Sequence, residues 1–96
     1  MPVCNVSLQV IPLVDPQDVY PIVDRVIDMI SSSGVKYTVG PMETTMEGKL
    51  EDLLGIVEKA QLICTEAGAD RVLSVVKIDY GTGGVTIEEK VGKYQS

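Results

Sequence analysis

The chain has 96 residues, of which 45% are hydrophobic and 23% are charged, and its formal net charge is −6. A single domain over residues 1–96 is therefore expected, near the size at which apolar burial only just offsets chain entropy. Its eight lysines and arginines are scattered, which argues against binding to nucleic acid or to an anionic membrane, because both need a basic surface.

The first residues carry no positive charge ahead of their apolar stretch, and polar residues and Pro12 interrupt that stretch. This pattern predicts neither a signal peptide nor a membrane span. We therefore expect a cytoplasmic protein in which Cys4 and Cys64 remain thiols.

The first predicted strand covers residues 3–11, because apolar and polar side chains alternate along it. One face carries Cys4, Val6, Leu8 and Val10, and the other carries Asn5, Ser7 and Gln9. The polar face has no charge, whereas a freely solvated face would more often carry Lys or Glu. We therefore expect this face to be partly covered.

Asp15, Pro16 and Asp18 indicate the start of a helix. Of the two aspartates we expect Asp18 to be the N-cap, because Pro21 would then lie in the first turn, where a missing N–H does no harm. Apolar residues at intervals of three and four form one continuous stripe. The stripe consists of Val19, Ile22, Val23, Val26, Ile27 and Ile30. Residues 31–34 end the helix.

Two short strands are predicted at residues 35–39 and 42–47, joined by a turn at Gly40 and Pro41. The second strand mixes apolar and polar residues, in the order Met42, Glu43, Thr44, Thr45, Met46 and Glu47. Polar side chains at this density need partners, because a buried donor or acceptor left alone costs roughly 1–3 kcal/mol. We interpret residues 37–48 as the floor of a small-molecule site, with a solvated strand face as the alternative.

The second predicted helix has an apolar stripe and is closed by Gly68. The stripe consists of Leu50, Leu53, Leu54, Val57, Ala60, Cys64 and Ala67. A fourth strand covers residues 71–80, where we expect Lys77 and Asp79 to pair with each other. After a glycine-rich joint, Thr86 and Glu89 form a capping box that opens a short helix ending near Tyr94.

The order of these elements is βαββαβ, which predicts an α+β fold of the ferredoxin-like type. Its antiparallel sheet has the spatial order 4-1-3-2, with the two main helices on one face. Residues 83–96 add a joint and a short C-terminal helix that docks onto the surface. The sheet face away from the helices must then meet water, a partner or a ligand.

The residue types argue against an enzyme. The chain has no histidine, so neither cysteine can form a thiolate–imidazole pair. The absence of a C-x-x-C spacing makes a metal site improbable. Glu43 and Glu47 lie four residues apart on a strand, about 13–14 Å, which is too far for a pair of glycosidase carboxylates. We expect no catalytic residue, metal or cofactor, and binding is the more economical interpretation.

Three segments together resemble a known family. Residues 37–48 are Y-T-V-G-P-M-E-T-T-M-E-G, residues 9–12 are Q-V-I-P, and residues 83–94 are G-G-V-T-I-E-E-K-V-G-K-Y. In these segments the chain is similar to the single-repeat form of the thiamine-binding protein family, whose members are small ferredoxin-like proteins. The resemblance implies a cytoplasmic, non-enzymatic protein that binds thiamine or its hydroxymethylpyrimidine moiety, as a carrier, buffer or sensor. It also implies a homo-oligomer, in which dimers pair into tetramers through their sheet faces.

The resemblance also implies a set of ligand-binding residues. The matching positions are Gln9, Tyr37, Glu43, Thr44, Thr45 and Glu47, and Ser7 joins them from the strand face of Gln9. Glu, Thr and Gln side chains can bond the edge of an aminopyrimidine, while Met and Tyr can cover its plane. The alternative function is an oligomeric scaffold or effector-sensing module that binds another metabolite or a protein.

Overall fold

The computed structural model describes residues 2–95 and contains four strands, two long helices and a short C-terminal helix. Their bounds are β1 Cys4–Pro12, α1 Pro16–Ser32, β2 Lys36–Val39, β3 Thr44–Gly48, α2 Leu50–Glu66, β4 Val72–Asp79 and α3 Ile87–Val91, followed by a 3-10 turn at Gly92–Tyr94. The antiparallel sheet has the order β2-β3-β1-β4. This is the predicted ferredoxin-like fold, which is confirmed.

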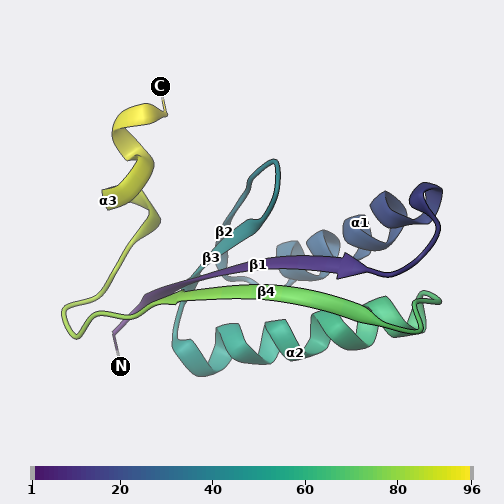
Figure 1. The fold of residues 1–96 in the computed structure, drawn as a ribbon. Helices are drawn as coiled ribbons and strands as arrows, with labels where there is room; N and C mark the ends of the chain where they lie inside the picture. The colour runs from purple at the N-terminus through teal and green to yellow at the C-terminus, as the bar shows by residue number, and fades with distance from the viewer. Residues whose placement is uncertain (1, 96) are drawn as a thin grey trace.

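The core lies between the sheet and the two long helices. It is built from the inward face of β1, from Met46 of β3 and from one line of side chains on each helix. Both cysteines belong to it as free thiols, and burial raises the pKa of each. Figure 1 shows α2 along one side of the sheet and α3 on the opposite side. We call the sheet face away from α1 and α2 the open face.

The start of α1 differs from the prediction. Asp15, not Asp18, occupies the N-cap position, and Pro16 is the first helical residue. Pro16 suits that position, because its N–H would be unpaired there in any case. Pro21 then lies inside the helix. The structure tolerates it there because Pro21 is exposed, so water can bind the helix carbonyl group that lacks a partner.

Two side-chain assignments also change. Leu54 is 41% exposed rather than part of the buried stripe of α2, and Ile56 is buried in its place. The buried line of Leu53, Ile56, Ala60 and Cys64 is narrow, because α2 meets the rest of the core along one side.

The strand predicted at residues 42–47 begins at Thr44 instead. Pro41 and Met42 form the tip of the hairpin, across which the Gly40 N–H donates to the Glu43 carbonyl oxygen at 2.8 Å.

The C-terminal segment docks on the open face through main-chain bonds and α3. The Val85 N–H donates to the Val3 carbonyl oxygen at 2.9 Å, and Ile87 is buried. The predicted cap is confirmed, because the Thr86 hydroxyl accepts a bond from the Glu89 N–H at 3.2 Å. No helix within residues 2–95 combines the length and apolar character needed to cross a membrane.

The two prolines of α1 provide a test of its boundary. We expect Pro21→Ala to raise the free energy of unfolding by about 1–2 kcal/mol, because it restores a helical hydrogen bond. The alanine also increases the conformational entropy of the unfolded chain, but this effect is smaller. Pro16→Ala is the matched control and should change it by less than about 1 kcal/mol. Urea denaturation measures both values. Equal effects of the two substitutions would contradict the placement of Pro21 inside the helix.

Candidate functional site

The sheet divides the predicted ligand-binding residues between its two faces. Residues paired across strands share a face, and the register pairs Ser7 with Thr45, and Leu8 with Thr44. The open face therefore takes Ser7, Gln9, Glu43, Thr45 and Glu47. Thr44 lies on the helix side, as does Tyr37, which pairs with the core residue Met46. The predicted residues therefore do not form one cluster.

A cavity of about 270 Å³ lies on the open face, between β1, β3, β4 and α3. Three of the predicted residues line it, namely Ser7, Glu43 and Thr45, together with Asn5, Lys77, Ile78, Asp79 and Lys90. We call it the open-face cavity. Its lining residues are polar or charged except Ile78.

Two ion pairs cross the open-face cavity. Lys77 contacts Oε1 of Glu43 at 3.1 Å, and Lys90 contacts Oδ2 of Asp79 at 2.6 Å. The predicted pairing of Lys77 with Asp79 is therefore wrong, because each finds an opposite charge on a neighbouring element. The hydrogen bond from Lys77 holds the pKa of Glu43 below its usual value.

Ser7 is the unsatisfied group of this cavity. Its side chain is 7% exposed, and within residues 2–95 its Oγ is the one buried side-chain polar atom that has no hydrogen-bond partner. Leaving such a hydroxyl alone costs roughly 1–3 kcal/mol. The hydroxyl therefore needs a water molecule or a ligand atom in the open-face cavity.

Glu47 and Asn5 hold the C-terminal segment in place. Glu47 Oε1 accepts a bond from the Ile87 N–H, the first of α3, at 2.7 Å. Asn5 donates to the Val85 carbonyl oxygen at 3.3 Å and accepts from Lys90 Nζ at 2.8 Å. The uncharged polar face of β1 is thus covered at this end by the chain itself.

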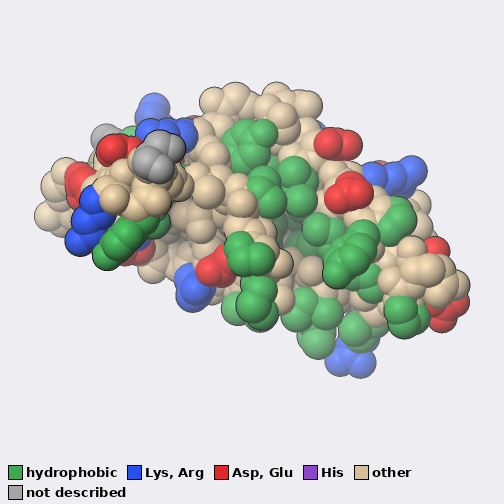
Figure 2. Space-filling model, turned by 90° about the horizontal axis from the view of Figure 1, so that it is seen from above, with side chains coloured by type: hydrophobic (Ala, Val, Ile, Leu, Met, Phe, Trp, Pro, Cys, Tyr) green, Lys and Arg blue, Asp and Glu red, His purple; other side chains and the backbone are tan. Residues whose placement is uncertain are grey.

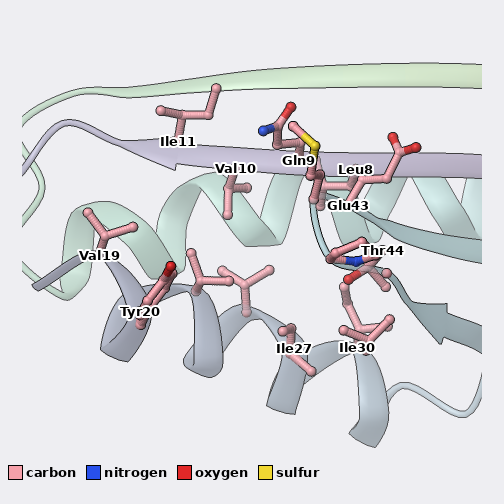
Figure 3. A pocket seen from close by; sticks show the side chains of 16 residues that line it. Leu8, Gln9, Val10, Ile11, Val19, Tyr20, Ile27, Ile30, Glu43 and Thr44 are labelled. Atoms are coloured by element: carbon pink, nitrogen blue, oxygen red, sulfur yellow. The ribbon is translucent and has the colours of Figure 1, made fainter. Parts of the chain in front are cut away.

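A second cavity, of about 300 Å³, lies between α1 and the end of β1. We call it the α1 groove; Figure 3 shows Val10 pointing into it from β1, with Val19 and Ile27 on α1. Val23 and Tyr20 complete its helical wall. Three predicted residues, Gln9, Glu43 and Thr44, also line it. The Thr44 side chain lies on the helix side, whereas Figure 3 shows the Gln9 and Glu43 side chains at the rim, on the side of β1 away from α1. The groove therefore combines apolar walls with a small polar group, as ligand pockets commonly do.

The α1 groove exists because β3 stops short. The ladder between β1 and β3 ends at the pair of Leu8 and Thr44, whereas β1 continues to Pro12 and there pairs with β4 alone. The hairpin tip at Pro41 and Met42 bends away in the place where further strand pairs would lie. Apolar residues along α1, among them Val19, Val23 and Ile27, consequently face a gap beside the sheet.

The sequence prediction missed the apolar wall of this groove. It placed Val19, Val23 and Ile27 in one continuous apolar stripe with Ile22, Val26 and Ile30, yet the first three are partly exposed and the last three are buried. The width of the stripe could have indicated the groove. The stripe has six apolar residues, whereas the buried line of α1 has three. Within residues 2–95 no cluster of three or more Cys, Asp or Glu side chains could hold a metal ion.

Comparisons with known proteins agree over nearly the whole chain. A family model described as thiamine-binding protein matches residues 6–95. UPF0045 protein CPE1503 from Clostridium perfringens (strain 13 / Type A) is 63% identical over 95 residues, covering 99% of this chain and 100% of that protein. These matches confirm the family resemblance seen in the sequence.

Two solved structures are also similar. A domain of unknown function, DUF77, from Bacillus cereus superposes with a TM-score of 0.92 at 46% identity, covering 99% of this chain and 92% of that one. A structure from Thermotoga maritima, described as a candidate thiamine biosynthesis/salvage protein (TM0486), has a TM-score of 0.91 at 41% identity, covering 98% of this chain and 100% of that one.

The contact of Glu47 with α3 gives a testable prediction. Glu47→Ala should lower the free energy of unfolding by about 1–3 kcal/mol, because the buried end of α3 loses a charge-assisted hydrogen bond. It should also speed amide exchange at Ile87 by about tenfold or more. Glu47→Gln retains an acceptor oxygen and should have a smaller effect on both measurements. Unchanged exchange at Ile87 in the alanine variant would refute this role.

Proposed function

The chain belongs to the thiamine-binding protein family, and we propose that it binds thiamine, or its hydroxymethylpyrimidine moiety, in the α1 groove. The observation that carries this proposal is the composition of the groove. Apolar side chains from α1 and β1 form its walls, Thr44 supplies a hydroxyl on the same side of the sheet, and Gln9 and Glu43 lie at its rim on the side of the open face. Its volume of about 300 Å³ is at the lower end of the range for small-molecule pockets.

The polar residues suit an aminopyrimidine. This ring has an exocyclic amine that donates hydrogen bonds and ring nitrogens that accept them. The Gln9 amide can both donate and accept, and so can the Thr44 hydroxyl. Val10 and Val23 offer apolar surface for the faces of the ring.

Charge favours the thiazolium half of thiamine. This ring is a cation, and the chain has a formal net charge of −6. Glu43 lines both the groove and the open-face cavity and contacts Lys77 through Oε1, so its carboxylate adds negative charge beside the groove. The lowered pKa of Glu43 keeps it ionised at neutral pH.

We propose binding without catalysis. General acid–base chemistry near pH 7 needs a group that titrates there. The pKa of Glu43 is lowered, and those of the Cys4 and Cys64 thiols are raised, so all three move away from neutrality. Reversible binding suits a carrier, buffer or sensor of thiamine.

A homo-oligomer is part of this proposal. Exposed apolar side chains from two paired strands lie together on the open face, namely Ile11 of β1 with Leu73 and Val75 of β4. Figure 2 shows hydrophobic side chains gathered on this side of the molecule. Such a patch is typical of an interface between proteins, and a sister subunit is the occupant that the family resemblance implies.

Calorimetric titration of the protein with thiamine and with hydroxymethylpyrimidine tests the ligand. We expect both to release heat, and Thr44→Val to weaken binding about fivefold or more, because it removes one hydrogen bond from a buried site. Thr38→Val, at an exposed position of β2, is the matched control and should leave affinity unchanged.

A third variant locates the ligand. Thr45→Val alters the open-face cavity and should leave affinity unchanged if the ligand lies in the α1 groove. Weakening by Thr45→Val but not by Thr44→Val would move the site to the open face. If neither compound binds, the proposed function is wrong and a scaffold or effector-sensing module takes its place.

Light scattering tests the assembly. We expect a mass above that of the monomer at micromolar concentration, and a monomer when Leu73 and Val75 are both changed to Lys, because two charges would then be buried in the interface. Leu62→Lys places a charge on an exposed leucine of α2 and should leave the oligomer intact. A monomeric wild-type protein would exclude this interface.

A further inference from the structure

The edge of β1 that borders the α1 groove is open. Beyond Leu8 this edge has no partner in β3, because the ladder ends at the pair of Leu8 and Thr44. Extending the register by two residues would place Met42 opposite Val10, but Met42 lies in the hairpin tip and makes no main-chain bond to Val10. Main-chain polar groups at this edge are therefore available to a molecule in the groove.

The ladder between β1 and β4 shows which main-chain groups face the groove. The Leu13 N–H donates to the Arg71 carbonyl oxygen at 2.9 Å, and the register continues without a break to the pair of Asn5 and Asp79. In an antiparallel pair the N–H and C=O of one residue point to the same side, and successive residues alternate. Odd-numbered residues of β1 therefore face β4, and even-numbered residues face β3 or, beyond its end, the groove.

Val10 is the residue that this alternation exposes. Leu8 is paired with Thr44, and Pro12 has no N–H to offer. Between them, the N–H and C=O of Val10 both point into the groove, and no other main-chain group in residues 2–95 bonds to them. One donor and one acceptor thus lie side by side above the apolar wall of α1.

We infer that the main chain of Val10 recognises the aminopyrimidine ring. This inference rests on the proposed function and specifies how the same groove selects its ligand. The Val10 C=O accepts a hydrogen bond from the exocyclic amine, and the Val10 N–H donates to the adjacent ring nitrogen. The ring then extends the sheet beyond the end of β3, as a peptide does when it adds to a free strand edge. Val23 and Ile27 of α1 support its face.

This arrangement makes binding depend on the amine. In the oxo analogue of thiamine a carbonyl group replaces the amine, and the adjacent ring nitrogen carries a proton. The carbonyl group of the analogue then faces the Val10 C=O, and its ring N–H faces the Val10 N–H. Neither pair can form a hydrogen bond. A site built around such a hydrogen-bond pair discriminates strongly against a ligand that lacks it.

Amide hydrogen exchange of the full-length protein, followed by NMR with and without saturating thiamine, tests this contact. We expect thiamine to slow exchange at the Val10 amide about tenfold or more. The Ile11 amide is the internal control, because it already bonds to β4, and its exchange should change little. An unchanged Val10 amide in protein that binds thiamine would overturn the inference and leave the proposed function standing.

Calorimetry adds a readout based on the ligand and on a variant. We expect the oxo analogue to bind at least about tenfold more weakly than thiamine. Val10→Pro removes the N–H and should weaken thiamine binding about tenfold or more, whereas Val10→Ala retains the N–H and should weaken it less. Pro12 already occupies an equivalent position on this edge, so the fold accommodates a proline there. Equal affinity for thiamine and the oxo analogue would refute recognition by Val10, and failure of thiamine itself to bind would refute the proposed function as well.

Discussion

The unequal length of two neighbouring strands determines where this molecule can bind a ligand. β1 has nine residues and β3 has five, and their register begins at the pair of Cys4 and Gly48. All of the mismatch therefore falls at one end of β1. There the sheet narrows while α1 keeps its full length, so apolar side chains of the helix face a gap instead of a strand. The α1 groove and the free main-chain edge of Val10 both follow from this mismatch.

The opposite end of β1 shows the contrasting outcome. There the open face is covered by the C-terminal segment, which Glu47 binds at the first N–H of α3 and Asn5 binds through Val85 and Lys90. The uncharged polar face of β1 led us to expect that something covers it. At this end of β1 the covering element is the C-terminal segment of the chain itself. Polar side chains of the same short strand therefore serve different purposes. Thr44 faces the α1 groove, whereas Glu47 holds α3 in place.

The sequence predicted the fold well because periodicity reports which face of an element is buried. The alternation in β1 and the stripe of α1 lead directly to the βαββαβ order, and Thr86 was identified as a cap from its spacing to Glu89.

Periodicity does not report the residue at which an element ends beside its neighbour. Two aspartates each precede a proline near the start of α1, so the sequence offered two plausible caps. The groove was missed because it depends on the residue at which β3 stops, which the hairpin tip at Pro41 and Met42 determines. The pairing of Lys77 with Glu43 depends on register in the same way.

Glu43 links the two cavities, because it lines both. Its bond to Lys77 is exposed to solvent, with 68% of the lysine side chain accessible, and exposed ion pairs contribute only about 0–1 kcal/mol. A cation held in the α1 groove by apolar contacts can therefore compete with Lys77 for this carboxylate at little cost. Lys77 would then be released beside Ser7 on the open face, near Val75 of the proposed interface between subunits. If displacement of Lys77 alters the affinity between subunits, assembly must alter the affinity for the ligand by the same factor, because coupling between two binding events is reciprocal.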